Sequence, residues 1–393
     1  MSTIKIGLFG SGVVGEGIYQ VLEQKASLGA EIKKVVIKQK DKARNAPSHL
    51  FSLNANDILE DDEIDLVVEL IDDSAAAYDI AEKALKSGKS VVSANKKMIA
   101  EKHKELIALS RENGVSFLYE AAVCGSIPII RNLEEYFDND LLHSVKGIVN
   151  GSTNYILSRM LKEGESFDVA LKSAKESGFA ESDPYLDVEG VDAAYKLGII
   201  ALHAFGKRVE LKDIIRKGIT SLHPFDFQYA KEKRSSIKLI AKSVGNDNNE
   251  LQALSVLPSF VPISEPLAQT NNEFNGVIVK SSLADEQFFY GKGAGRFPTS
   301  SAVLSDISAF KYDYRYEYKK GIEDFIPQNN TTASFYISFN GDKDVNKDLF
   351  ERIEESFTGR ERSYLLGEIK LSKLLASEVL QDPEISVIQL QKD

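Results

Sequence analysis

An acidic loop followed by a helix with one lysine is the feature of this sequence most suited to chemistry. The stretch begins with the acidic side chains Glu181, Asp187 and Asp192 and continues into an apolar helix that carries Lys196 near its start. Asp192 and Lys196 are four residues apart, so they share one face of the helix. Carboxylates beside an amine at the start of a buried helix suit the binding of an amino group and the transfer of a proton. The alternative is an ordinary surface ion pair, which is common and weak.

A glycine-rich turn near the start of the chain predicts a dinucleotide site. An apolar strand over Ile4–Phe9 precedes the turn, and an amphipathic helix over about Val13–Leu28 follows it. The turn consists of Gly10, Ser11, Gly12, Val13, Val14 and Gly15. In this pattern the first glycine allows a tight turn, the second admits a pyrophosphate and the third lets the helix pack on the strand. The helix N-terminus then faces the phosphates with the positive end of its dipole. Without the flanking elements, the pattern would indicate only a common glycine turn.

The end of the second predicted strand, Ile32–Ile37, bears on the choice of nucleotide. An NAD site usually carries Asp or Glu there for the ribose hydroxyls. Here the chain continues as Lys38-Gln39-Lys40-Asp41-Lys42. Lys38 and its basic neighbours suit a 2′-phosphate, so NADP is favoured over NAD. A solvated charged loop is the alternative.

Strands and helices alternate over the first third of the chain. The predicted strands are Asp65–Ile71, Ser90–Ser93 and Val115–Glu120, and the predicted helices are Ala75–Ser87 and Ile99–Asn113. Such repeated units imply a parallel sheet with helices on both faces, which binds ligands at the carboxyl ends of its strands. Lys96 lies just past one of these ends, so we expect it to point toward the cleft. A surface lysine at the start of a helix is the alternative.

The architecture changes in the middle of the chain. A helix over about Ile129–Tyr136 and a strand over Val145–Val149 precede a cluster of hydroxyl and amide side chains, and a helix over Tyr155–Glu163 follows the cluster. The cluster comprises Asn150, Gly151, Ser152, Thr153 and Asn154. It could hold a carboxylate or an amino group, with Gly151 and Ser152 as substrate contacts, or it could serve only as an N-cap.

Composition narrows the class of protein. The formal net charge is −11 without a long basic block, which argues against nucleic acid or an anionic membrane as the main partner. Cys124 is the single cysteine, so an internal disulfide is excluded and a reducing, cytoplasmic setting is expected. The histidines are scattered, which makes a His/Cys metal site unexpected. The sequence shows neither a leader pattern nor an apolar stretch of transmembrane length.

Patterns in the second half predict further strands and a small final module. We expect Leu251–Leu257 to be a strand of an open sheet, with Pro258, Pro262 and Pro266 bounding edges and turns. Residues 299–310 should form a helix that returns to the nucleotide domain. Residues 311–330 are rich in tyrosine and read as a linker or an exposed strand. The expected elements of the final module are strands over 333–339, 364–369 and 385–390, and helices over 346–357 and 371–380.

Long motifs resemble homoserine dehydrogenase. They are VVSANKKMIA, LYEAAVCGSIPII, GIVNGSTNYILSRM and GFAESDPYLDVEGVDAAYKLGIIAL, with GKGAGRFPTSSAVLSDI at 291–307. The resemblance covers about residues 4–310 in order. It implies NAD(P)-dependent interconversion of L-aspartate 4-semialdehyde and L-homoserine, on the route to threonine, isoleucine and methionine. It also implies a homodimer or a higher homo-oligomer that uses the outer face of the sheet.

The resemblance implies roles for the polar residues of the acidic loop and its helix. Lys196 matches the lysine that donates a proton to the aldehyde oxygen as hydride arrives, and Lys96 matches a second active-site lysine. Glu181 and Asp192 match carboxylates that bind the amino end of the substrate, and Asp187 matches an acidic residue beside them. An ordinary lysine is protonated at neutral pH and can stabilise and protonate a developing alkoxide.

The same resemblance implies contacts with the cofactor and a cation. Gly178 and Gly295 match glycines that lie against the cofactor, and Ser93 stands where threonine is frequent beside the nicotinamide. With the residues above, the expected cofactor contacts are Gly10, Gly12, Val13, Val14, Gly15, Lys38, Ser93, Lys96, Gly178 and Gly295. A monovalent cation, usually sodium, would be held largely through carbonyl oxygens of Glu120, Val123, Gly125 and Ile127.

The sequence also departs from the family pattern. Asp72-Asp73 replaces a frequent glycine pair after the strand at Asp65–Ile71, which could alter the cofactor loop. Cys124 and Ser126 interrupt a run usually rich in glycine, Ser152 replaces threonine, and Lys38 replaces arginine. None of these changes removes a proposed catalytic group.

The expected fold class is α/β, with three parts. A Rossmann-type parallel-sheet domain spans 1–130 plus about 299–325, and an α+β substrate and dimerisation domain spans 131–298. The third part, 331–393, resembles an abbreviated ACT domain that lacks one strand and a Pro-Gly turn. It could bind a feedback ligand such as threonine or be a structural appendage. Two further readings of the whole chain are another amino-acid or semialdehyde dehydrogenase and a catalytically silent nucleotide sensor.

Overall fold

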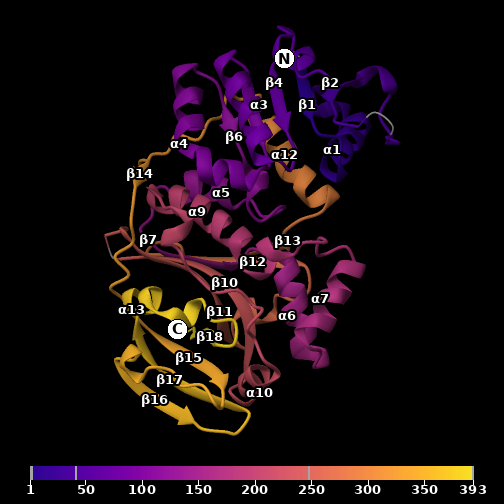
Figure 1. Ribbon diagram of the computed structural model, residues 1–393. Coiled ribbons are helices and arrows are strands. Elements are labelled where there is room, and N and C mark those ends of the chain that lie inside the picture. Colours follow the sequence, from indigo (N-terminus) through magenta and orange to yellow (C-terminus); the bar gives the residue numbers. More distant parts are fainter. Residues whose placement is uncertain (1–2, 40–41, 247, 392–393) are drawn as a thin grey trace. The chain divides into compact units, whose positions relative to one another are not determined.

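The structure, a computed structural model, describes residues 3–39, 42–246 and 248–391. The described chain divides into two compact units, whose elements are labelled in Figure 1. The first unit comprises Met1–Tyr136 and Lys292–Lys319, and the second comprises Phe137–Gly291 and Lys320–Asp393. Residues 331–393 therefore belong to the same compact unit as the substrate region.

The first unit is built on a parallel sheet. Its strands are β1 (Ile4–Phe9), β2 (Ala30–Val36), β3 (Phe51–Ser52), β4 (Leu66–Glu69), β5 (Ser90–Ser93) and β6 (Phe117–Leu118). They run in the order β3-β2-β1-β4-β5-β6, and each neighbouring pair is parallel. The order reverses between β1 and β4, and in such sheets ligands bind at the carboxyl ends of the strands near that point. The predicted Rossmann-type fold is confirmed.

Helices connect the strands of the first unit. They are α1 (Val13–Gln24), α2 (Asn56–Leu59), α3 (Ser74–Lys86), α4 (Lys96–Glu112), α5 (Ile129–Arg131) and α12 (Arg296–Phe310). The chain returns to this unit through α12, which packs against α1 (Figure 1). A side chain at Gly17 would collide with Ser300 and Arg296 of α12, so glycine permits this close packing.

The second unit is built on a mixed sheet that runs in the order β13-β12-β7-β10-β11-β18-β15-β17-β16, with β9 also paired to β11. The strands are β7 (Leu142–Ile148), β9 (Ile215–Arg216), β10 (Ser235–Gly245), β11 (Leu251–Pro262), β12 (Phe274–Ser281), β13 (Asp285–Lys292), β15 (Thr332–Asn340), β16 (Arg352–Phe357), β17 (Arg362–Lys370) and β18 (Ser386–Leu390). A separate ladder joins β8 (Lys207–Arg208) to β14 (Glu323–Asp324). The strands of the final module thus extend the sheet of the substrate region.

The helices of the second unit include the one that carries Lys196. They are α6 (Gly151–Glu163), α7 (Phe167–Glu176), α8 (Tyr185–Val188), α9 (Val191–Phe205), α10 (Pro224–Glu232), α11 (Pro266–Gln269) and α13 (Leu371–Ala376). Left-handed glycines bound α9, with φ of 71° at Gly190 and 66° at Gly206. The helix is buried along nearly its whole length against β7, β10 and β11. A buried, capped helix holds its polar side chains in fixed positions.

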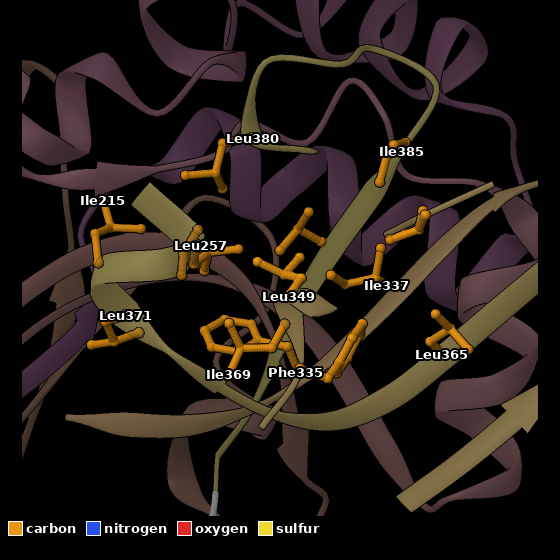
Figure 2. Packing of buried hydrophobic residues seen from close by; sticks show 14 of the residues in the cluster. Ile215, Leu257, Phe335, Ile337, Leu349, Leu365, Ile369, Leu371, Leu380 and Ile385 are labelled. Atoms are coloured by element: carbon orange, nitrogen blue, oxygen red, sulfur yellow. The ribbon is translucent and has the colours of Figure 1, made fainter. Parts of the chain in front are cut away.

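A shared hydrophobic core joins the final module to the substrate region. Side chains from β9 and β11 pack with side chains from β15, β17, α13 and the segment before β18. Figure 2 shows Leu257 of β11 and Leu349 of the module pointing into the same cluster. Burial of this apolar surface stabilises the joined sheet.

Pro258 is an exception to the predicted role of the prolines. It lies inside β11, where it pairs with Leu239, so the prediction that it bounds an edge is wrong. Its missing N–H falls between the residues that pair with β9 and those that pair with β18. A proline is tolerated at such a gap in the ladder.

The predicted helix over 346–357 is wrong. The chain forms a short 3-10 turn over Lys347–Leu349 and then the edge strand β16. The apolar residues of this stretch are spaced as on a helix: Leu349, Phe350, Ile353 and Phe357. In the structure, however, Leu349 and Phe350 pack into the core, and β16 pairs with β17. Tertiary pairing therefore overrides the local periodicity.

The tyrosine-rich segment has the irregular backbone of a linker, and the alternative reading of an exposed strand over its tyrosines is wrong. Residues 311–319 form turns and irregular backbone, and Tyr316 and Tyr318 are buried. The hydroxyls of Tyr119 and Tyr318 are 2.8 Å apart, and the rings of Tyr119 and Tyr316 pack edge to face. The alternation of tyrosine and charge buries Tyr316 and Tyr318 within the first unit and leaves Arg315 and Glu317 in solvent.

Across residues 3–39, 42–246 and 248–391, none of the helices combines the length and hydrophobicity needed to cross a membrane.

Candidate active site

The glycine-rich turn between β1 and α1 leaves space beside the helix N-terminus. Gly10 has a φ of +98°, and a Cβ there would lie 2.8 Å from the carbonyl oxygen of Leu70. A Cβ on Gly15 would collide with the Gly10 carbonyl, whereas a Cβ on Gly12 would meet nothing within 4 Å. Gly12 caps α1 without a side chain, so the first-turn N–H groups are left for another acceptor. This open turn with a positive helix end fits a pyrophosphate.

Two valines continue the turn into α1. Val13 is 59% exposed, although it is a large apolar side chain at the first position of the helix. The carbonyl of Val14 accepts a hydrogen bond from Ser300 Oγ at 3.0 Å, which ties the start of α1 to α12. Gly295, at the start of α12, has a φ of +123°, a backbone conformation that favours glycine. The glycine turn and Gly295 thus lie at the start of α1 and of its neighbour α12, whereas Lys38, Ser93 and Lys96 lie at the ends of β2 and β5.

Lys38 lies exposed just beyond β2, as predicted. Lys40 and Asp41 of the same basic run lie outside the described residues. Asp73 of the departing Asp72-Asp73 pair caps α3 by accepting hydrogen bonds from the N–H groups of Ala75 and Ala76. These hydrogen bonds, with the positive charges of Lys38 and Lys97 as smaller effects, lower the pKa of the Asp73 carboxyl.

A buried carboxyl at the end of β4 organises the end of β5. Glu69 is fully buried and accepts hydrogen bonds from Ser93 Oγ and from the N–H of Ile71, each at 2.6 Å. Burial raises the pKa of Glu69 to about 7, against the opposing effect of these hydrogen bonds. Ser93 Oγ in turn accepts from the N–H of Asn95 at 3.1 Å. The sequence analysis did not single out Glu69; its only signal was a charged residue inside an apolar strand.

Lys96 is the first residue of α4, and Asn95 caps that helix. Asn95 Oδ1 accepts from the N–H of Met98 at 3.0 Å, and its Nδ2 donates to the carbonyl of Ile71 at 3.0 Å. The network of Glu69, Ser93 and Asn95 therefore fixes the loop that leads into Lys96. Lys96 therefore lies just past the carboxyl end of β5.

In the second unit, Lys196 is held inside a compact hydrogen-bonded group. Its Nζ donates to Asp192 Oδ2 at 2.7 Å and to the carbonyl oxygen of Val149 at 2.8 Å. The side chains of Lys196 and Asp192 are 11% and 3% exposed. The pair is therefore buried, and the reading of an ordinary surface ion pair is wrong.

Asp187 joins this group through Asn150. The side-chain amide of Asn150 donates to Asp187 Oδ1 at 2.7 Å and to Asp192 Oδ2 at 2.8 Å. Within the described parts of the chain, the group consists of Val149, Asn150, Asp187, Asp192 and Lys196. Glu181 is exposed on the loop between α7 and α8 and is not a member.

The other predicted contacts of the second unit lie around α6 and α7. Ser152 Oγ donates to the carbonyl of Phe179 at 2.6 Å, which ties the start of α6 to the acidic loop. A Cβ on Gly151 would lie 2.7 Å from the carbonyl of Glu273, so only glycine fits there. Gly178, with a φ of +75°, follows the last turn of α7, and its N–H bonds to the carbonyl of Lys175.

The turn after β6 contains the residues predicted to hold a cation. Glu120 Oε1 and Oε2 accept hydrogen bonds from the N–H groups of Ile130 and Arg131 at 2.9 and 2.8 Å, so this carboxyl caps α5. Burial raises the pKa of Glu120 to about 8. Cys124 and Gly125 follow with φ of 58° and 52°.

Close packing surrounds this turn. A Cβ on Gly125 would lie 2.5 Å from the carbonyl of Gly293, and Ile127 donates its N–H to the carbonyl of Cys124. Cys124 is a buried free thiol. The Glu120 side chain is thus used by backbone N–H groups, and any cation here would rest on carbonyl oxygens, including that of Val123.

The first unit has a glycine-rich turn on a parallel sheet whose strand order reverses, and the second unit has a buried lysine–carboxylate group. Together these two features define the class of dinucleotide-dependent dehydrogenases. Residues 10–120 match the family profile "Homoserine dehydrogenase, NAD binding domain", and residues 128–308 match the profile "Homoserine dehydrogenase". The chain belongs to the homoserine dehydrogenase family.

Individual relatives agree with this assignment. The homoserine dehydrogenase of Bacillus subtilis (strain 168) is 37% identical over 324 residues, which cover 80% of this chain and 74% of the relative. That of a Synechocystis species is 40% identical over 314 residues, covering 78% and 72%. The crystal structure of a homoserine dehydrogenase from Thiobacillus denitrificans superposes with a TM-score of 0.86 at 29% identity and covers 99% of this chain and 98% of that one.

The predicted family and activity are therefore confirmed. The chain is an oxidoreductase of amino-acid biosynthesis that uses a nicotinamide dinucleotide and acts on a small-molecule substrate. The matches favour neither a different semialdehyde dehydrogenase nor a catalytically silent sensor.

Proposed function

We propose that Lys196 protonates the aldehyde oxygen during reduction and accepts that proton in the reverse reaction. A lysine ammonium has three N–H donors. Within the described residues, Asp192 and the Val149 carbonyl take two of them, and this observation supports the proposal because one donor is left for a substrate oxygen. The ammonium is also held in place by a buried helix, so its geometry is set before substrate binds.

The carboxylates beside Lys196 are the proposed site for the substrate's ammonium group. Asp192 and Asp187 lie together through Asn150, and two carboxylates attract one cation strongly in a buried setting. Glu181, on the exposed loop, would add a third carboxylate, and Gly151 and Ser152 would contact the substrate near the start of α6. Lys96 is proposed as the second lysine of the site.

The residues around the α1 N-terminus are the proposed cofactor contacts of the first unit. The nicotinamide dinucleotide, when bound, supplies or accepts the hydride. The first-turn N–H groups of α1, including those of Val13 and Val14, would bind its pyrophosphate, and Gly12 would leave room for it. Ser93, whose hydroxyl is held by Glu69, and Gly295 would lie beside the cofactor, as would Gly178 from the second unit.

Homoserine-dependent reduction of NADP and NAD at alkaline pH tests the proposed chemistry. Lys196→Met should lower kcat by about 100-fold or more, in the range of general acid–base catalysis, while homoserine still binds. Lys242→Met is a matched control, because Lys242 is a largely buried lysine on β10 that bonds to Gln391. A Lys196→Met enzyme that binds homoserine and turns over at the wild-type rate would refute the proton-transfer role.

We also propose that NADP is preferred over NAD. Lys38 supports this, because it is an exposed cation beyond the end of β2, where a 2′-phosphate is recognised. Lys38→Glu should reduce kcat/KM for NADP by about tenfold and leave that for NAD within about twofold, as expected for loss of one charge-assisted contact. If the ratio of kcat/KM for NADP to kcat/KM for NAD stayed unchanged in this variant, the assignment of Lys38 to the 2′-phosphate would be contradicted.

A sodium ion bound by the turn after β6 is a further proposal. The described residues contain no group of three or more His, Cys, Asp or Glu side chains that could hold a metal ion. The carbonyl oxygens of Glu120, Val123, Gly125 and Ile127 are therefore the proposed ligands, and hard oxygen donors suit such an ion. Activity in sodium chloride should exceed activity in tetramethylammonium chloride at equal ionic strength; equal activity in the two salts would exclude the cation.

We propose a cytoplasmic homodimer or higher homo-oligomer. Exposed aromatic side chains at the edge strand β13, Phe288 and Tyr290, support an interface on the sheet, because exposed apolar patches mark contact surfaces. The free thiol of Cys124 suits a reducing compartment. Light scattering coupled to size-exclusion chromatography gives the oligomer size, and a monomer at working concentration would refute the interface.

A further inference from the structure

The side chain of Asn150 uses both ends of its amide within the second unit. It is 5% exposed. Its Nδ2 donates to Asp187 Oδ1 and Asp192 Oδ2, at 2.7 and 2.8 Å. Its Oδ1 accepts from the N–H of Thr153 at 2.9 Å and lies 3.0 Å from Thr153 Oγ1. One amide thus links the start of α6 to two carboxylates of the substrate site.

Chemistry permits only one orientation of this amide. If it were turned over, its oxygen would face both carboxylates, and its NH2 group would face the N–H of Thr153. Both arrangements place like groups together, and buried polar groups without suitable partners are costly. The two N–H groups of Asn150 are therefore fixed on Asp187 and Asp192.

The amide also offsets repulsion between the carboxylates. Asp187 and Asp192 both lie within hydrogen-bond distance of one nitrogen, and neighbouring negative charges repel each other. Asn150 satisfies one oxygen of each carboxylate without adding a charge. Two carboxylates held together in this way suit a cationic group of the substrate.

Asn150 reaches Lys196 through Asp192. Asp192 Oδ2 accepts from both Asn150 Nδ2 and Lys196 Nζ, so these two donors share one oxygen. The carbonyl of Val149, the residue before Asn150, accepts the second hydrogen bond of Lys196. A shift of the chain at Val149 and Asn150 would move both acceptors of the lysine together.

We propose that Asn150 is a positioning residue that sets the spacing of Asp187 and Asp192 and the direction of the Lys196 ammonium. This rests on the proposed function, in which those carboxylates bind the substrate's amino group and Lys196 transfers the proton. The competing explanation is that Asn150 is only the N-cap of α6, since Asn is a preferred cap.

Two substitutions separate these explanations. Serine and aspartate are N-caps about as good as asparagine, so Asn150→Ser and Asn150→Asp both preserve the start of α6. Serine is too short to reach the carboxylates, and aspartate adds a third negative charge beside them. Ser166→Ala is the matched control, because it removes the cap of the neighbouring helix α7 without touching the carboxylate group.

Steady-state kinetics of homoserine oxidation, with KM for homoserine and for NADP measured separately, is the test. Asn150→Ser should lower kcat/KM for homoserine by about tenfold or more, since hydrogen bonds to charged groups are among the stronger ones. Asn150→Asp should lower it further. KM for NADP and the thermal midpoint should stay close to wild type for the serine variant, and Ser166→Ala should leave kcat/KM for homoserine unchanged.

Two outcomes overturn the proposal. If both Asn150 variants keep kcat/KM for homoserine within about twofold, the residue is only a cap. If NADP affinity and thermal stability fall as much as kcat/KM for homoserine, Asn150 contributes only to general folding. A wild-type enzyme without homoserine-dependent turnover would refute the activity itself, and an active Lys196→Met enzyme would refute only the proton-transfer role, so these failures are distinguishable.

Discussion

Glu69 makes the stability of the first unit depend on pH in a direction opposite to that of a salt-bridged carboxylate. Its carboxyl is fully buried at the end of β4, and burial raises its pKa from 4.5 to about 7. Below about pH 4.5 the carboxyl is protonated in both the folded and the unfolded chain. As the pH rises from about 4.5 toward 7, the unfolded chain loses this proton while the folded chain keeps it, so the free energy of unfolding falls. The contribution of the protonated carboxyl is lost as the pH rises through about 7.

The size of this effect follows from the change in pKa. One pKa unit corresponds to about 1.36 kcal/mol, so the loss between pH 4.5 and pH 8.5 is about 3 kcal/mol. Glu69→Gln retains a neutral group that resembles the protonated acid next to Ser93 and Ile71. The variant should therefore gain about 3 kcal/mol relative to wild type between pH 5 and pH 8.5, which is about 6–12 °C in the thermal midpoint for a domain of this size.

Scanning calorimetry of both proteins at the two pH values measures this difference. Exposed Glu60→Gln is the control, and its midpoint should follow wild type at both pH values. A constant difference between Glu69→Gln and wild type across this range would refute the reasoning, because it would mean that the folded Glu69 carboxyl loses its proton at the same pH as the unfolded one.

Four other substitutions have definite expected outcomes. Gly15→Ala should lower the thermal midpoint, because its Cβ would collide with the Gly10 carbonyl and overpacking costs about 1–3 kcal/mol. Gly12→Ala should keep the thermal midpoint and raise KM for the nucleotide, because a Cβ at Gly12 meets no protein atom within 4 Å. Asp192→Ala should cost about 3–5 kcal/mol in urea unfolding because it leaves the Lys196 ammonium buried without its carboxylate. Lys217→Met should increase proteolysis near residues 379–382, since Lys217 Nζ donates to the carbonyls of Val379, Leu380 and Asp382.

Features set by short stretches of sequence could be predicted. β1 and β5 have the predicted bounds because each centres on buried apolar residues and is followed at once by a loop. The pairing of Asp192 with Lys196 could be predicted because both residues lie on one helix, four positions apart. The glycine turn could be predicted because it stands between a strand and a helix.

Features set by distant contacts could not be predicted. The partners of the Asn150 amide are 37 and 42 residues away, and the local sequence of Asn150 indicates only a helix cap. The burial of Glu69 depends on the strands and helices packed around the end of β4. The buried tyrosines Tyr316 and Tyr318 were read as exposed because Tyr119, their partner, is about 200 residues earlier in the chain.

The place of β18 in the sheet has a consequence for synthesis of the protein on the ribosome. β18 lies between β11 and β15, so the sheet of the second unit stays divided until Ser386–Leu390 has emerged. The parallel sheet of the first unit ends at Leu118 and can form much earlier. Translation from Pro262, the end of β11, to Ser386 takes roughly 6–25 s at about 5–20 residues per second. During that time the unpaired edge of β11 is exposed, and it is the segment of the nascent chain that chaperones must protect from aggregation.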